Sequence, residues 1–315
     1  MISIKWDKNR CPNNIELPSG WVFYTFRQGD EPLWCGITPN VAQRLKVIRQ
    51  KAESDSRYGE NSSAADTLQI ESYPQAIDAL IRFKVFLSKQ QPRFQHAMRT
   101  SRDYVYLALD ARRFPFVCVK EDTNDDWTYL GPWRGRFFLT DVIDSFARIL
   151  KLPNCETDSH PCEKLESGAC QGWCQAFAED LSEDQKPDLE KLETLLRETY
   201  LHPQNGILEM ISKERDRYFD DLEFAKADLL DDEIEKLTQY RDWLNFLYVT
   251  KSLNYNEEEF GVKNGLMSWC LYEGMSYEFA NAPVSYRDNE LLAINLIDTD
   301  EARLLYEYHV KHRKG

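Results

Sequence analysis

Four cysteines lie close together near the middle of the chain. Cys155, Cys162, Cys170 and Cys174 are separated by six, seven and three residues. Four thiols this close in a chain without a recognisable secretory signal indicate a metal ion or an iron–sulfur cluster, because reducing compartments do not keep disulfides. The spacing is not the paired Cys-x-x-Cys of most structural zinc sites. We therefore expect an iron–sulfur cluster, with zinc as the alternative.

The composition predicts a globular protein. Hydrophobic residues make up 42% of the 315 residues, which excludes a disordered chain. The N-terminal stretch MISIKWDKNR has no apolar signal core, and no apolar run reaches the ~18 residues of a membrane span. We therefore expect a cytoplasmic protein that makes no membrane contact.

The net charge of −14 is unevenly divided along the chain. Residues 1 to 151 contain 22 Lys and Arg against 18 Asp and Glu, whereas the remainder contains 17 against 35. Phosphate binding is therefore expected in the front part, because basic side chains neutralise phosphates. The acidic back part is expected to be a solvated face or a surface for a protein partner.

The first half of the chain shows both strand and helix patterns. Aromatic and β-branched runs predict a hairpin over 20 to 36, and apolar residues at helical spacing predict helices from Val41 and from Pro74. Residues 54 to 65 are polar and are expected to form a loop. Two further strands are predicted at 104 to 109 and 116 to 120, followed by a helix capped by Thr140.

The second half is helical and then returns to strand patterns. Three helices are expected from Pro187 onward, the last two forming an antiparallel hairpin joined at Asp220 and Asp221. Asn264-Gly265 indicates a hairpin turn, and a box-like cap at Asp298 and Glu301 predicts a final helix. The fold class is therefore α+β: a small mixed sheet with helices, a cysteine-rich junction, a helical hairpin and a small C-terminal α+β segment.

Three short stretches and three of the cysteines occur in a characteristic order. The stretches are YTFRQGDEPLWCGITPNVAQRL from Tyr24, QQPRFQ from Gln90 and YLGPW from Tyr129, and the cysteines follow as Cys-x7-Cys-x3-Cys. Together, over residues 16 to 174, they resemble the UvrC and Cho family, whose chains begin with a GIY-YIG nuclease domain. The resemblance implies DNA repair by nucleotide excision and a [4Fe-4S] cluster at the cysteines.

The resemblance also implies which residues would act in nuclease chemistry. Family members use one divalent metal held by Glu, with a Tyr near the attacking water and an Arg near the phosphate. Tyr24 and Arg44 match the tyrosine and the arginine. The remaining family positions have lost their residue types: the second Tyr is Trp34, the Lys is Ile37, the metal-binding Glu is Phe83 and the final Asn is Gln95.

Phe83 cannot hold a metal, so we do not expect a divalent metal at the nuclease position. Whether the chain is an enzyme stays open, because Asp78 or Glu71 is an alternative carboxylate for a rebuilt site. Tyr24 and Arg44 also have a simpler interpretation as a core aromatic and a solvated helix residue. If they contact DNA, we expect Arg134 and Arg136 of the GPWRGR segment to contribute as well.

A second resemblance lies in the acidic half. The stretch DLEFAKADLLDDEIEKL, from Asp221, resembles the UVR hairpin through which UvrB and UvrC bind each other. It implies a UvrB-like partner held by an apolar face. The residues expected on that face are Phe224, Ala227, Leu230 and Ile234.

Four segments are expected along the chain. Residues 1–100 form the nuclease-like domain, 101–178 the strand pair with the GPW segment and the cysteines, 179–255 the acidic helical region, and 256–315 a small C-terminal segment. Three functions remain: an inactive nuclease that binds DNA, a UvrB-like protein or both; an active Cho-like endonuclease that incises damaged DNA; and a protein-interaction module that does not bind DNA.

Overall fold

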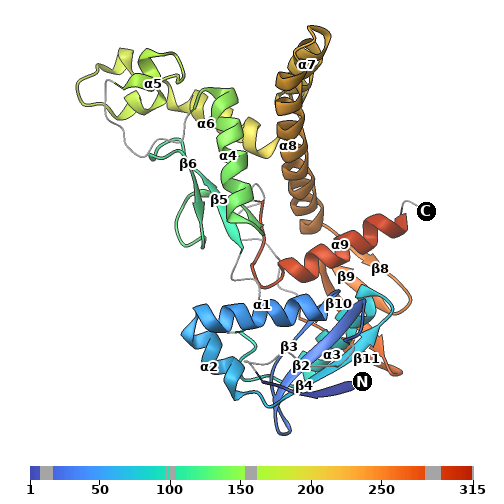
Figure 1. Cartoon of the computed structure of the whole chain (residues 1–315). Helices are drawn as coiled ribbons and strands as arrows, with labels where there is room; N and C mark the ends of the chain where they lie inside the picture. Colours follow the sequence, from blue (N-terminus) through green and yellow to red (C-terminus); the bar gives the residue numbers. More distant parts are fainter. Residues whose placement is uncertain (8–16, 97, 99–103, 153–161, 281–291, 314–315) are drawn as a thin grey trace. The chain divides into compact units, whose positions relative to one another are not determined.

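The computed structural model shown in Figure 1 describes residues 1–7, 17–96, 98, 104–152, 162–280 and 292–313. The chain divides into two compact units. The first comprises residues 1–102, 252–283 and 297–315, and the second comprises 103–251 and 284–296. Helices and small sheets occur in both, which confirms the α+β class. Among the described residues, no helix is long and apolar enough to cross a membrane.

The first unit is built on a four-stranded antiparallel sheet of order β1-β4-β2-β3. The expected hairpin forms its centre and edge, because alternate aromatic and aliphatic residues of β2 and β3 can be buried on both faces. Two further strands complete the sheet through pairings distant in sequence. The bounds are β1 (Ile2–Lys5), β2 (Trp21–Gln28), β3 (Glu31–Thr38) and β4 (Thr67–Tyr73).

Three helices accompany this sheet: α1 (Val41–Ser54), α2 (Ser56–Ala64) and α3 (Ala76–Lys89). The expected polar loop over 54 to 65 is wrong, because most of it is α2. The Asp55 side chain accepts a hydrogen bond from the Tyr58 amide and so caps this helix. Tyr58 is buried, which ties a largely polar helix to the core.

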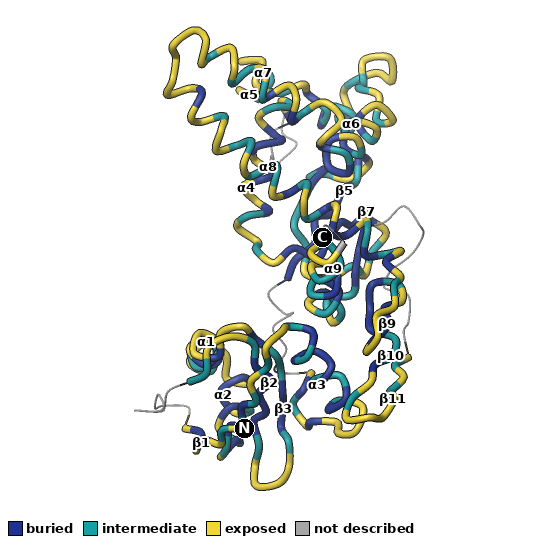
Figure 2. Tube along the Cα trace, turned by 90° about the vertical axis from the view of Figure 1, so that its right-hand side faces the viewer, coloured by how far each residue is buried: buried dark blue, intermediate teal, exposed yellow. Residues whose placement is uncertain are grey.

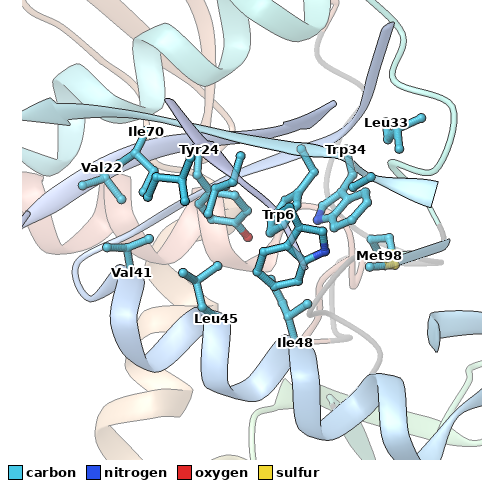
Figure 3. Close-up of a cluster of buried hydrophobic side chains, with 14 of the residues drawn as sticks. Trp6, Val22, Tyr24, Leu33, Trp34, Val41, Leu45, Ile48, Ile70 and Met98 are labelled. Carbon is cyan, nitrogen blue, oxygen red and sulfur yellow. The ribbon is translucent and has the colours of Figure 1, made fainter. Parts of the chain in front are cut away.

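The main core of this unit lies between α1 and one face of the sheet. In Figure 3, Val41, Leu45 and Ile48 of α1 project toward the sheet, and Tyr24 and Trp34 point from the strands toward the helix. The other sheet face packs against α3 through a second apolar cluster. That cluster contains Phe23, Cys35 and Phe86, with Ile37, Tyr73, Phe83 and Leu87 around it.

The C-terminal segment belongs to this first unit. It contributes an antiparallel sheet and a final helix, and both contact α3. Asn264 and Gly265 are both left-handed (φ 51° and 78°), which confirms the turn expected from the Asn-Gly pair. The bounds are β8 (Tyr255–Asn256), β9 (Phe260–Lys263), β10 (Leu266–Tyr272), β11 (Met275–Glu278) and α9 (Thr299–Arg313).

A salt bridge joins α3 to α9. Lys84 Nζ lies 2.9 Å from Glu301 Oε2, and both side chains are largely buried. Glu301 Oε1 also accepts a hydrogen bond of 2.9 Å from the Met267 amide of β10. One carboxylate therefore connects three elements of the unit.

The second unit contains a sheet of order β12-β7-β5-β6 and the helix α4. The helix begins at Arg136, four residues before the cap expected at Thr140, whose hydroxyl donates to the Arg136 carbonyl inside the helix. Gly135 occupies the cap position. The bounds are β5 (Val105–Leu109), β6 (Val117–Lys120), β7 (Thr128–Trp133), β12 (Leu292–Ala293) and α4 (Arg136–Leu150).

The rest of this unit is helical. The antiparallel pair α7 and α8 confirms the hairpin expected around Asp220 and Asp221. Figure 2 shows that the hairpin is exposed toward its tip and more buried toward its base. The bounds are α5 (Glu163–Glu166), the 3-10 helices η2 (Trp173–Phe177) and η3 (Glu183–Gln185), α6 (Leu189–Leu201), α7 (Ile207–Asp220) and α8 (Phe224–Lys251).

Candidate functional site

Tyr24 lies on the central strand β2 and faces α1. Its ring is 6% exposed and packs edge-on against Phe26. The phenol group lies directly against Gly36 of the neighbouring strand, where a Cβ atom would come within 2.6 Å of the hydroxyl. Burial raises the pKa of Tyr24, although the positive charge of Arg44 acts in the opposite direction. The phenol is therefore a neutral hydrogen-bond donor at physiological pH.

Arg44 lies in the first turn of α1 and is half-buried. Its charge is close enough to influence the Tyr24 hydroxyl. Within the described residues, neither the guanidinium of Arg44 nor the hydroxyl of Tyr24 has a hydrogen-bond or ion-pair partner. A guanidinium and a phenol that have no protein acceptor can both donate to an anion such as a carboxylate or a phosphate.

The other family positions are occupied by packing residues. Trp34 is 1% exposed and stacks on Phe26 with ring centroids 4.1 Å apart. Ile37 and Phe83 belong to the apolar cluster on the opposite face of the sheet. The side-chain amide of Gln95 pairs with both backbone groups of Cys35, at 2.9 and 3.0 Å. The side chains at these positions are engaged in apolar packing and, for Gln95, in hydrogen bonds to the backbone.

The two alternative carboxylates already have structural roles. Glu71 binds Arg82 through two hydrogen bonds of 2.9 and 3.0 Å and accepts a third from Tyr73. It also lies on the α3 side of the sheet, whereas Tyr24 lies on the α1 side. Asp78 accepts the Gln75 amide and so caps α3. Neither carboxylate joins Tyr24 and Arg44.

The cysteine region lies partly outside the described residues, since Cys155 falls in the gap from 153 to 161. Cys174 is buried, and Cys162 and Cys170 are partly buried. The Cys170 sulfur accepts a hydrogen bond from the Gly172 amide at 3.1 Å. In the described part of the chain, no three Cys, His, Asp or Glu side chains are placed to hold a metal ion. The cluster therefore stays a prediction.

The residues expected on the partner-binding face of the hairpin have different environments. Phe224 is 49% exposed and contacts Phe219 edge-on. Ala227 is 2% exposed, so the close approach of α7 buries it within the hairpin. Leu230 and Ile234 are half-buried. Of the expected face, only Phe224 is well exposed, because the hairpin uses much of that face for its own packing.

Arg134 and Arg136 belong to the second unit, at the turn from β7 into α4. Both side chains are exposed. Arg136 forms an ion pair of 2.8 Å with Glu121. Within the described residues Arg134 forms no ion pair. The structure therefore assigns these arginines and the Tyr24–Arg44 pair to different units.

Curated proteins named UvrABC system protein C match the chain. The protein from Fervidobacterium nodosum is 22% identical over 75% of this chain and 40% of its own length. The protein from Methanococcus maripaludis is 18% identical over 88% of this chain and 52% of its own length. The chain is UvrC-like. It spans about half the length, or less, of these curated relatives.

Other comparisons with this UvrC-like chain found nothing. No family model matches it, and no solved structure matches it. The resemblance noted in the sequence is thus confirmed by similarity to individual UvrC proteins.

Two features of the UvrC-like chain were missed by the sequence analysis. Asp300, at the start of α9, lies close enough to Tyr24 for its charge to raise the pKa of that tyrosine. Phe137, in the first turn of α4, is 87% exposed. The proximity of Asp300 to Tyr24 could not be predicted, because the two residues are far apart in sequence. The exposure of Phe137 had a local signal, because this aromatic residue lies between Arg136 and the apolar face of the expected helix.

Proposed function

We propose that this chain is a nucleotide-excision-repair protein that binds DNA through Tyr24 and Arg44 without cutting it. Its similarity to UvrC proteins supports the repair function. The loss of carboxylate at Phe83 supports the absence of hydrolysis, because an aromatic ring in an apolar cluster cannot hold the divalent metal that family members use.

One observation carries the DNA-binding proposal. Arg44 is half-buried in a chain with excess negative charge, yet no carboxylate of the described residues pairs with it. Partly buried guanidinium groups normally have anionic partners. A backbone phosphate that accepts from both Arg44 and Tyr24 would supply that partner.

The test is binding of a labelled duplex at low ionic strength. Arg44→Ala should weaken binding and lower the salt dependence by about one released counterion. Arg57→Ala is the matched control, because Arg57 is an exposed arginine of the same unit. Equal binding by wild type and Arg44→Ala contradicts the proposal. Absence of any duplex binding by the wild type favours an interaction module that does not bind DNA.

The α7–α8 hairpin supports a protein-binding role in the same function. Its tip exposes Phe219, Leu222 and Phe224 among many acidic residues, and exposed apolar side chains within an acidic surface suit a protein partner better than DNA. We propose a UvrB-like protein as that partner. Phe219→Ser with Phe224→Ser should abolish the complex, as measured by calorimetry with purified UvrB.

A second candidate function, metal-dependent incision, is favoured by Asp300. This carboxylate lies close enough to Tyr24 to act on it electrostatically. Nicking of supercoiled DNA with Mg²⁺ or Mn²⁺ tests it. Cleavage that is lost in both Asp300→Asn and Arg44→Ala would establish a rebuilt site and would rule out the non-cutting proposal.

A further inference from the structure

The turn between β7 and α4 exposes a basic and aromatic surface. Trp133 ends β7 and is 1% exposed, and Leu139 begins the buried face of α4 and is 0% exposed. Between them, Arg134, Arg136 and Phe137 all face solvent. Phe137 is 87% exposed, which is more than any other large hydrophobic residue in the described part of the chain.

Helix geometry holds Phe137 in this outward position. The buried face of α4 is formed by Leu139, Val142, Ile143 and Phe146. Phe137 precedes Leu139 by two residues, which is a rotation of about 200° around the helix. The next residue, Phe138, takes the inward direction and packs near the Trp133 ring at 6.4 Å. Phe137 cannot turn inward without exposing the core residues of the same helix.

The two arginines beside Phe137 are available to an anion. Arg134 forms no ion pair with any described residue. The Arg136–Glu121 pair measures 2.8 Å, but its side chains are 47% and 81% exposed. Such a surface pair contributes little, so a phosphate can replace Glu121. Asp141, one turn further along the exposed side of α4, is the carboxylate that opposes an anion there.

We propose that Arg134, Arg136 and Phe137 form a binding surface for single-stranded DNA, in which an unstacked base lies on the Phe137 ring and the arginines contact the adjacent phosphates. The choice of DNA rests on the proposed function. The choice of a single strand rests on the ring, because the base faces of a duplex are already stacked on one another.

A comparison with Phe219 separates this surface from a protein-binding patch. Phe219 at the hairpin tip is also exposed, at 58%. Its basic neighbours Arg215 and Arg217 are both bound to carboxylates, and Asp220 and Asp221 follow it. Carboxylates beside an exposed aromatic ring repel a phosphate backbone. Two guanidinium groups beside such a ring attract the phosphates of a DNA strand, and the ring offers a stacking partner to the bases of that strand.

The experiment is anisotropy of a labelled twelve-residue oligothymidylate with the full chain at low ionic strength. Phe137→Ala should weaken binding roughly 5- to 150-fold, the range of a lost base–aromatic stack. Phe137→Trp should retain binding. Arg134→Ala should weaken it and reduce the salt dependence by about one counterion. Asp141→Asn should strengthen it, because a like charge is removed.

Phe219→Ala is the matched control and should bind as the wild type does. Circular dichroism and thermal melting verify folding, which an exposed side chain should not alter. Equal affinities of wild type, Phe137→Ala and Phe137→Trp overturn the proposal, as does equal loss in Phe137→Ala and Phe219→Ala. Duplex binding that depends on Arg44 is measured separately. Its absence beside a Phe137-dependent oligothymidylate complex overturns the proposed function but supports this surface.

Discussion

The rings of Trp133 and Tyr240 are stacked in parallel, with centroids 4.6 Å apart and an interplanar angle of 2°. Trp133 is the last residue of β7, and Tyr240 lies near the middle of α8. Trp243, one turn further along α8, donates its indole N–H to the Pro132 carbonyl at 3.0 Å. The GPW segment therefore anchors the long helix of the hairpin.

This anchor predicts a large loss of stability on substitution. Trp133→Ala should lower the free energy of unfolding by about 3–5 kcal/mol, because it leaves a cavity under a buried ring. Trp243→Phe should cost about 1 kcal/mol for the lost hydrogen bond. Urea denaturation measures both values. Phe137→Ala, which removes an exposed ring from the same turn, should change little, and a comparable loss there would contradict this assignment.

The contacts of Glu301 predict a graded series. Glu301→Gln removes the ion pair with Lys84 but keeps an acceptor for the Met267 amide, and should cost about 1–2 kcal/mol. Glu301→Ala also leaves that amide unpaired and should cost about 1 kcal/mol more. Thermal melting shows whether the wild type, Glu301→Gln and Glu301→Ala have stabilities that decrease in this order. The exposed Arg303–Glu307 pair provides the control, since Glu307→Gln should stay within about 0.5 kcal/mol.

Glu71 predicts a pH dependence of stability. Burial alone would raise its pKa, but the hydrogen bonds and the charge of Arg82 and the bond from Tyr73 hold the pKa of Glu71 below its ordinary value. A lowered folded-state pKa stabilises the protein above the unfolded pKa, and this contribution is lost as the pH falls through the folded value. The deficit of Glu71→Gln, about 2 kcal/mol at pH 7, should therefore shrink in melting curves recorded toward pH 3. A deficit independent of pH would disprove the linkage.

Gly36 predicts a steric limit at the Tyr24 hydroxyl. An alanine Cβ would lie 2.6 Å from that hydroxyl and 2.8 Å from its ring carbon, so Gly36→Ala should displace the ring and cost about 1–3 kcal/mol. Adding Tyr24→Phe should recover part of the loss. Chemical denaturation of the single and double variants measures this recovery. Gly135→Ala, whose nearest contact would be 3.5 Å, should be tolerated.

The cysteines predict a coloured protein. After anaerobic purification, a [4Fe-4S] cluster should give broad visible absorption and iron on metal analysis. Cys170→Ser and Cys174→Ser should remove the colour and make the surrounding segment sensitive to protease. Cys118→Ser, outside the quartet, should keep both the colour and the resistance to protease. A colourless protein that contains zinc would contradict the iron–sulfur cluster and would indicate a zinc site at these cysteines.

Local sequence rules predicted many elements of this fold. The Asn264-Gly265 turn and the α1 helix capped by Asn40 follow from short-range chemistry that the sequence shows directly. The helix α2 was missed because its residues are mostly polar, although Asp55 is a typical cap. Strands β1 and β4 were missed because their stability depends on pairing with distant strands.

The candidate site was only partly predictable for the same reason. Tyr24 and Arg44 came from the resemblance to a family, since an aromatic strand residue and a helical arginine carry no special signal by themselves. The contribution of α9 could not be foreseen. Asp300 of α9 acts on Tyr24 of β2 although the two residues lie near opposite ends of the sequence, and no periodicity or spacing connects residues across such a distance.

The chain path between the two units has a practical consequence. The first unit is assembled from residues 1–102, 252–283 and 297–315, so the backbone passes between the units four times. A protease cut at any single crossing leaves the units covalently joined elsewhere. A chain shortened after Lys251 would lose β12 from one unit and α9 from the other. The second unit can therefore be obtained separately only by cutting the chain at every crossing or by rearranging the order of the segments in the gene.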